Sequence, residues 1–118
     1  MTEDALGRLR EFEEELGVDV AIELIELFLE DAPAQLETMG AALGGGDANT
    51  LKRAAHSLKG SCSNLGLNTL SSCAAALEQH AGARGCDGAQ PLLDAVVSKH
   101  DSLQPGLKAL RESLRAKL

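Results

Sequence analysis

The chain is poor in aromatic and basic residues, and each shortage excludes a class of partner. Among its 118 residues the only aromatics are two phenylalanines, with no tryptophan or tyrosine. Eleven Lys and Arg stand against eighteen Asp and Glu, which gives a net charge of −7. Nucleic-acid binding ordinarily uses a basic surface and stacking aromatic rings, and an anionic membrane surface would repel this charge. The composition therefore argues against nucleic-acid and membrane partners.

Long apolar runs and paired cysteines are also missing. No stretch approaches the roughly 20 apolar residues that cross a bilayer, and the first residues lack the cationic and apolar regions of a signal peptide. The three cysteines, Cys62, Cys73 and Cys86, are an odd number without a CxxC pair. Neither a disulfide framework nor a zinc site is indicated. We expect a soluble, cytoplasmic protein in which Cys62 and Cys73 are small buried thiols.

Leucine and alanine dominate what is present. The chain has 21 Leu and 18 Ala against only 10 Val, Ile and Thr together. Straight-chain residues and Ala lose little rotamer freedom in a helix, whereas β-branched residues favour sheets. Apolar residues recur at helical spacing between clusters of Gly, Pro and Asp. The pattern predicts five helices, over residues 3–16, 19–43, 48–65, 68–81 and 91–114.

Four long amphipathic segments with short connections predict an all-α fold, an antiparallel up-down-up-down four-helix bundle in a single domain, 1–118. The short first segment would cap one end. Asp19 is the expected N-cap of the second segment, Pro33 should kink or break it, and Pro105 should kink or split the last. The residues expected to face inward in the first two segments are Leu6, Leu9, Phe12, Leu16, Leu24, Leu27, Phe28, Leu36, Met39 and Leu43.

The third segment places a histidine on its solvent side. Its apolar stripe is centred near Leu51, and His56 lies about 140° from that centre at 100° per residue. The helical neighbours of His56 are then Lys52, Lys59, Gly60 and Ser63. A lone surface histidine is ordinarily inert, so the neighbours decide how this one is interpreted.

Gly60 and the local charge both single out His56. An exposed glycine inside a helix costs roughly 0.8 to 1 kcal/mol relative to alanine, so a bare backbone there needs a reason. It would let another macromolecule bring a reactive group close to the imidazole. Between Asp47 and Glu78 the chain has three cations and no acid, whereas the remainder has a net charge of −10. Such a cationic island suits an anion such as a phosphoryl group.

Residues 55–67, AHSLKGSCSNLGL, closely resemble the signature of histidine-containing phosphotransfer (Hpt) domains. Residues 27–33 and the Leu77-Glu78 pair resemble that family more loosely. The resemblance implies a four-helix bundle whose exposed histidine accepts a phosphoryl group from the phospho-aspartate of one receiver domain. The group then passes to the aspartate of another receiver in a phosphorelay.

The resemblance also implies roles for individual residues. His56 would be the phosphorylated residue, Lys59 would assist electrostatically, and Gly60 would leave room for the active site of the receiver. Glu78 stands where some members of the family carry a glutamine that hydrogen-bonds the imidazole. A solvated helix residue is an equal alternative for Glu78. Phe28 and Leu29 are candidates for an exposed contact with the receiver, although helix arithmetic favours a buried Phe28.

The predicted activity is that of a phosphocarrier rather than an enzyme. A neutral imidazole, with an ordinary pKa of about 6.5, can attack phosphorus without a separate base. The sequence offers no candidate triad, metal cage or glycine-rich phosphate loop. No cofactor is expected on this chain, and the Mg²⁺ should come from the partner. The expected partners are response-regulator receiver domains and a hybrid sensor histidine kinase, with the chain itself a monomer.

Three alternatives compete with this interpretation. A histidine-kinase dimerisation helix expects an acidic residue after its histidine, where this chain has Ser57, and an ATP-binding domain. A metal-binding bundle could use His56, His80, His100 and the cysteines, but no two of these stand four residues apart. His80 and His100 are better interpreted as residues at the margin of the core. A purely structural interaction module leaves Gly60 unexplained.

Overall fold

The computed structural model describes the backbone of residues 3–118 and the side chains from residue 10 onward, so the predicted positions of Leu6 and Leu9 lie outside the described side chains. This part of the chain forms five helices and no strand. The helices are α1 (Glu3–Leu16), α2 (Val18–Gly44), α3 (Ala48–Asn64), α4 (Asn68–Arg84) and α5 (Gln90–Arg115). The predicted all-α class is confirmed.

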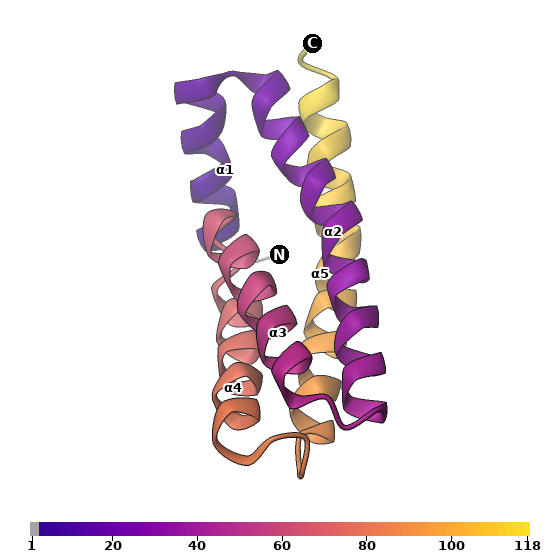
Figure 1. Ribbon diagram of the computed structural model, residues 1–118. Coiled ribbons are helices and arrows are strands. Elements are labelled where there is room, and N and C mark those ends of the chain that lie inside the picture. Colours follow the sequence, from indigo (N-terminus) through magenta and orange to yellow (C-terminus); the bar gives the residue numbers. More distant parts are fainter. Residues whose placement is uncertain (1–2) are drawn as a thin grey trace.

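The last four helices form an antiparallel bundle (Figure 1). Helix α2 contacts α3 and α5, and α4 contacts the same two helices, so the four close into a ring. With 27 and 26 residues, α2 and α5 are longer than the 17-residue α3 and α4, and they project beyond the α3–α4 hairpin. Helix α1 lies along the projecting part of α2 and covers that end of the bundle (Figure 1). The predicted topology and the capping helix are confirmed.

Neither proline breaks its helix. Helix α2 runs through Pro33 and α5 runs through Pro105, so the predicted splits do not occur. Both prolines are exposed. The carbonyl that loses its amide partner at such a position can be hydrated by water, because it lies on the solvent side. The buried faces continue past both prolines, from Ala32 to Met39 in α2 and from Leu103 to Leu107 in α5.

Two predicted helix boundaries are wrong. Helix α2 begins at Val18 after Gly17, whose φ is 96°, so Asp19 lies in the first turn instead of capping it. Helix α4 continues to Arg84, beyond the predicted end near residue 81, so Gly82 is helical and does not lie in a loop. The helix stops at Gly85, where φ is 67°, because that conformation cannot continue a right-handed helix.

The predicted start of α3 is correct and has a clear cause. The carboxylate of Asp47 accepts a hydrogen bond from the Thr50 amide at 3.1 Å and another from the Thr50 hydroxyl at 2.6 Å. These bonds lower the pKa of Asp47 and satisfy an amide that has no partner within the helix. The cap therefore sets where α3 begins, and with it which side of α3 faces the core.

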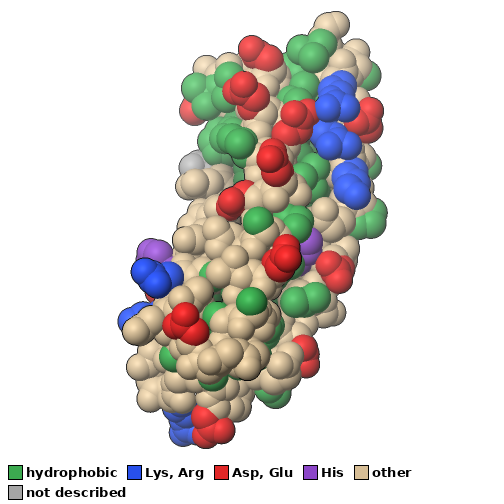
Figure 2. Space-filling model, turned by 45° about the vertical axis from the view of Figure 1, so that its right-hand side comes forward, with side chains coloured by type: hydrophobic (Ala, Val, Ile, Leu, Met, Phe, Trp, Pro, Cys, Tyr) green, Lys and Arg blue, Asp and Glu red, His purple; other side chains and the backbone are tan. Residues whose placement is uncertain are grey.

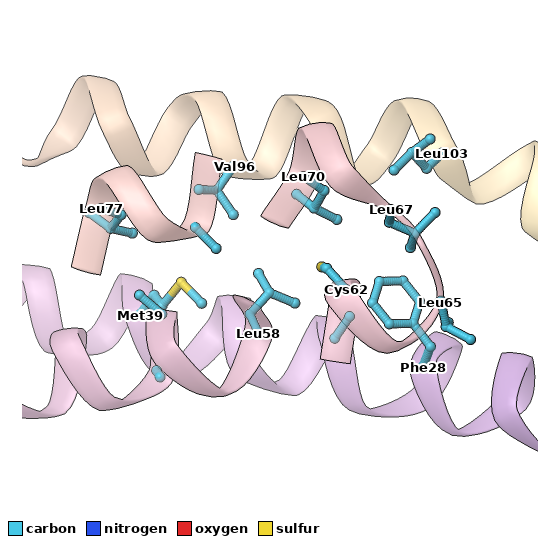
Figure 3. Close-up of a cluster of buried hydrophobic side chains, with 14 of the residues drawn as sticks. Phe28, Met39, Leu58, Cys62, Leu65, Leu67, Leu70, Leu77, Val96 and Leu103 are labelled. Carbon is cyan, nitrogen blue, oxygen red and sulfur yellow. The ribbon is translucent and has the colours of Figure 1, made fainter. Parts of the chain in front are cut away.

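The core lies between the four bundle helices, where Phe28, Leu58, Cys62 and Leu70 point towards one another (Figure 3). Phe28 is 4% exposed, as predicted, but Leu16 is 52% exposed and Leu27 is 62% exposed, so the predictions for these two leucines are wrong. The buried face of α2 is made by residues spaced three and four apart, namely Ala21, Ile22, Ile25, Phe28, Ala32, Met39 and Ala42. Leu27 is turned by about 200° from Ile25, which places it outside that stripe.

The cysteines and two of the histidines lie mostly at or inside the core. Cys62 is buried as predicted, and burial together with the neighbouring Cys73 thiol raises the pKa of Cys62 to about 12. Cys73 is half-buried instead of buried. His100 is buried, and His80 is half-buried with Nε2 at 2.5 Å from the carbonyl oxygen of Asp87. None of the helices within residues 3–118 is long and apolar enough to cross a membrane.

Candidate functional site around His56

His56 lies on the solvent side of α3, as the helical spacing predicts. Its side chain is 67% exposed. Ala55 and Leu58, one and two positions away, are fully buried and hold the opposite side of α3 against the core. Because successive helical residues turn by about 100°, burial of these neighbours directs His56 outwards. The imidazole is therefore accessible to a second macromolecule.

Glu78 of α4 joins His56 to Lys59. Glu78 Oε2 lies 2.8 Å from His56 Nδ1, and Glu78 Oε1 accepts a hydrogen bond from Lys59 Nζ at 2.8 Å. The Glu78 side chain is only 17% exposed. The hydrogen bond from Lys59, and secondarily that from His56, lowers the pKa of Glu78 against the opposing effect of burial. Of the two alternatives for Glu78, the structure shows the one in which it contacts the imidazole.

This contact determines the tautomer of the neutral imidazole. An ionised carboxylate can only accept hydrogen bonds, so the Nδ1 atom of His56 must carry the proton that Glu78 binds. The other ring nitrogen, Nε2, then carries a lone pair. Since the ring is exposed and Nδ1 is turned towards Glu78, a nucleophilic nitrogen faces solvent.

The antiparallel register of α3 and α4 brings these residues together. Ser63 Oγ lies 2.9 Å from Ser71 Oγ, and the Ser71 hydroxyl also donates to the carbonyl oxygen of Lys59 at 3.3 Å. His56 lies seven residues before Ser63 on α3, and Glu78 lies seven residues after Ser71 on the antiparallel α4. The α3–α4 register therefore selects Glu78 as the partner of the imidazole.

Gly60 has open space where a side chain would be. A Cβ atom built at Gly60 would meet no atom within 4 Å outside its own stretch of helix. Tight packing therefore does not explain the glycine. Because Gly60 lies one turn beyond His56 on α3, any side chain there would project into the solvent beside the imidazole.

Two depressions flank α3. The first contains His56 and is lined by Asn49, Lys52, Arg53, His56, Ser57 and Glu78. The second lies between α3 and α2 and is lined by Leu24, Leu27, Phe28, Asp31, Ser61, Asn64 and Leu65. Figure 2 shows acidic side chains spread over one face of the molecule and a histidine beside Lys or Arg side chains at its left edge. The first depression is cationic and the second is largely apolar.

The exposed Leu27 is the functional candidate that the sequence analysis missed. It was assigned to the core because it is apolar and close to Phe28. The spacing of Ile25, Phe28 and Ala32 could have identified it, since Leu27 does not fit that stripe. Leu29, the other predicted contact, is half-buried against the core, and Phe28 is buried.

The metal-binding alternative finds no ligand set in the described residues. No group of three or more His, Cys, Asp or Glu side chains comes together there as metal ligands would. His56 instead directs Nδ1 to Glu78, and His100 lies inside the bundle beside Gln104 and Asp101. The three histidines thus belong to separate surroundings.

Comparison with known proteins identifies the family. A family model described as the Hpt domain matches residues 23–117. The chain belongs to the Hpt domain family. Its bundle also matches the crystal structure of histidine-containing phosphotransfer protein B from Pseudomonas aeruginosa PAO1, with a TM-score of 0.84 and 28% identity over 90% of this chain and 91% of that one. Histidine phosphotransfer in phosphorelay signalling is accordingly the function of this Hpt domain.

A curated relative is the sensor protein TorS of Escherichia coli strain K12. It is 36% identical to the chain over 74 residues, which are 63% of this chain and 8% of TorS. The chain therefore corresponds to a small part of that much longer protein. As an Hpt domain, the chain is a phosphocarrier module of two-component signalling.

Proposed function

We propose that His56 Nε2 is the atom that accepts the phosphoryl group from the phospho-aspartate of one receiver domain and returns it to the aspartate of another. The observation that carries this proposal is the 2.8 Å contact between His56 Nδ1 and Glu78 Oε2. It leaves the exposed Nε2 as the nucleophile. Both of the other histidines lack this combination of exposure and an orienting carboxylate, because His100 is buried and His80 Nε2 contacts the Asp87 carbonyl oxygen.

The transfer balances without a proton leaving the imidazole. The Nε2 lone pair forms the N–P bond while the P–O bond of the phospho-aspartate breaks, and the freed aspartate carboxylate keeps that electron pair. Phosphorylated His56 then retains its Nδ1 proton and gains a positive charge, which the ionised Glu78 stabilises. Transfer to the second receiver reverses these steps. Positioning and charge neutralisation, rather than an acid or base on this chain, carry the chemistry.

Lys59 and Gly60 have different roles in this proposal. Lys59 holds Glu78 in place through the 2.8 Å hydrogen bond and adds positive charge beside the phosphoryl group. Gly60 leaves the approach to Nε2 open, since a Cβ there would face only solvent. The active site of a receiver can therefore come close to the imidazole, where transfer between two proteins needs reacting atoms about 3 to 3.5 Å apart.

The receiver is proposed to dock over the apolar depression between α2 and α3. Leu27 is 62% exposed at its edge, and Ser61 on α3 lines the same depression one residue after Gly60. Exposed apolar side chains beside an open approach are typical of contact surfaces between proteins. The contact residue is thus Leu27 and not the buried Phe28.

The partners follow from this reaction. They are response-regulator receiver domains and a hybrid sensor histidine kinase, with Mg²⁺ bound by the receiver and no cofactor bound by this chain. The chain acts as a carrier without kinase or phosphatase machinery of its own. We propose that residues 1–118 act as a single monomeric domain in the cytoplasm.

The decisive experiment follows radioactive phosphoryl transfer from a phosphorylated receiver domain. Label on the chain should be acid-labile and base-stable, as phosphohistidine is, and should be absent from His56→Gln. His80→Gln is the matched control, because it removes another histidine, half-buried on α4, that has no contact with Glu78, and it should accept label like the unmodified chain. Label that persists on His56→Gln would refute the assignment.

A further inference from the structure

Lys52 differs from the other cations near His56. Lys59 is bound to Glu78, and Arg53 lies close enough to Asp47 to help lower the pKa of that carboxyl. Within the described part of the chain, no hydrogen bond or ion pair involves the Lys52 side chain. Lys52 nevertheless lines the depression that contains His56. It is a free positive charge at the candidate site.

The side chain of Lys52 lies across the bare backbone of Gly82. A Cβ atom built at Gly82 would lie 3.5 Å from Lys52 Cε and 3.6 Å from Lys52 Nζ. These are ordinary van der Waals separations, so an alanine fits and a longer side chain would occupy the place of Lys52. Lys52 and Gly82 also line a third depression, which lies beside Lys59 and Glu78. The absence of a side chain at Gly82 therefore leaves room for the Lys52 side chain against α4.

This contact lies one turn from the His56–Glu78 contact. Lys52 precedes His56 by four residues on α3, and Gly82 follows Glu78 by four residues on the antiparallel α4. One helical turn rises about 5.4 Å, which a four-carbon lysine side chain spans. The ammonium of Lys52 thus lies about one helical turn from the His56–Glu78 contact, and Lys52 lines the same depression as His56.

The cations around His56 outnumber the carboxylate, so the site can neutralise the charge of a phosphoryl group. Lys52, Arg53 and Lys59 carry three positive charges against the single carboxylate of Glu78. A phosphoryl group brings nearly two negative charges and three acceptor oxygens. Lys59 has its ammonium on Glu78, so the phosphoryl oxygens need another donor.

We infer that Lys52, held against the bare backbone of Gly82, binds the phosphoryl oxygens of phosphorylated His56, while Lys59 keeps Glu78 in place. This inference rests on the proposed phosphorylation of His56. Lys52 is thus a positioning residue for the stored phosphoryl group. Hydrolysis of that group breaks the N–P bond, returns the electron pair to Nε2 and passes phosphorus to water. A charge-assisted hydrogen bond from the Lys52 ammonium to the phosphoryl oxygens stabilises the stored group, so loss of that bond should shorten the lifetime of the group.

The test measures the lifetime of phosphohistidine in the absence of any receiver. The full chain is loaded with phosphoramidate, whose P–N bond breaks as Nε2 forms its own bond to phosphorus and ammonia leaves. After removal of the reagent, phosphorus NMR follows the decay. Lys52→Met should shorten the lifetime roughly two- to fivefold, the size of one exposed ion pair. Lys108→Met, which removes an exposed lysine from α5, should leave it unchanged.

Variants of Gly82 separate the position of Lys52 from its charge. Gly82→Leu keeps every charge but fills the place of the lysine side chain, so it should shorten the lifetime as Lys52→Met does. Gly82→Ala adds only a methyl group at ordinary contact distance and should behave like the unmodified chain. The double variant Lys52→Met with Gly82→Leu should decay no faster than either single variant, because both act through one contact.

Other outcomes overturn the inference in distinguishable ways. An unchanged lifetime in Lys52→Met shows that Lys52 does not bind the phosphoryl group. A shortened lifetime in Lys52→Met with no effect of Gly82→Leu shows that the charge acts at a distance and that the Gly82 contact has no role. Failure of the unmodified chain to form phosphohistidine, or its formation in His56→Gln, refutes the proposed function itself and this inference with it.

Discussion

Replacing Gly60 should raise stability and lower activity at the same time. The site is exposed, and a Cβ there meets nothing within 4 Å. Gly60→Ala therefore gains only helix propensity, which is worth about 0.8 to 1 kcal/mol. For a domain of this size that gain raises the Tm by roughly 3 to 5 °C. Gly60→Gln should gain nearly as much, because glutamine is also a good helix former.

The same substitutions at Gly60 should lower the rate of phosphoryl transfer from a receiver, although they raise the Tm. The glutamine side chain projects into the open space beside His56, through which we propose that the receiver approaches. Loss of close approach by even one ångström can slow a reaction between positioned groups by about a hundredfold. We expect the Gly60→Gln variant to accept the phosphoryl group at least roughly tenfold more slowly than the unmodified chain. The transfer rate of Gly60→Ala should lie between those of the unmodified chain and Gly60→Gln. Loading by phosphoramidate, which needs little space, should be affected much less.

Gly40 provides a matched control for Gly60. It is another exposed glycine inside a helix, α2, and a Cβ there also meets nothing within 4 Å. Gly40→Gln should raise the Tm by a similar amount without slowing transfer. Thermal denaturation and quench-flow transfer assays measure both effects. A Gly60→Gln variant that transfers as fast as the unmodified chain would refute the steric role of Gly60. A Gly60→Gln variant with a lower Tm would contradict the observation that a side chain at this position meets no other atom.

Three further predictions concern the residues around the site and the core. Lys59→Ala should slow transfer while lowering the free energy of unfolding by no more than about 1 kcal/mol, since the pair is partly exposed, and a large drop in Tm would show that Lys59 is structural. The ionised form of Glu78 stabilises the fold because its pKa is lowered from 4.5. The unmodified chain should therefore have a higher Tm than Glu78→Gln, and this difference should be constant above about pH 5. The difference should disappear as the pH falls through the lowered pKa of Glu78. A difference that persists at pH 2 would contradict this prediction. Leu27→Ser should leave the Tm nearly unchanged and slow transfer from a receiver but not loading by phosphoramidate, and equal transfer rates would exclude Leu27 from the docking surface.

The sequence alone predicted the bundle because local signals and the apolar pattern agree along most of the chain. Asp47 with Thr50 shows how this works, since a side-chain cap that can be recognised from the sequence sets the first turn of α3. The exposed position of His56 follows from the same pattern. The break that was one of the two alternatives at Pro33 does not occur, because the proline lies on the exposed side of a helix whose buried face continues past it. Leu27 was misjudged because hydrophobicity was given more weight than its angle from the core stripe.

The contact between His56 and Glu78 could not be derived from helix rules, because it depends on the register between two helices. That register is determined by the turn that joins α3 to α4, where Gly66 has a φ of 71° and the Leu67 amide bonds back to the Cys62 carbonyl. One residue more in this turn would rotate α4 by about 100° and direct Glu78 away from the imidazole. The same register decides that Gly82 meets Lys52 whereas Gly60 meets nothing. Two exposed helical glycines that look equivalent in the sequence therefore have different surroundings, and we propose that one accommodates a side chain of the same domain and the other the approach of a partner.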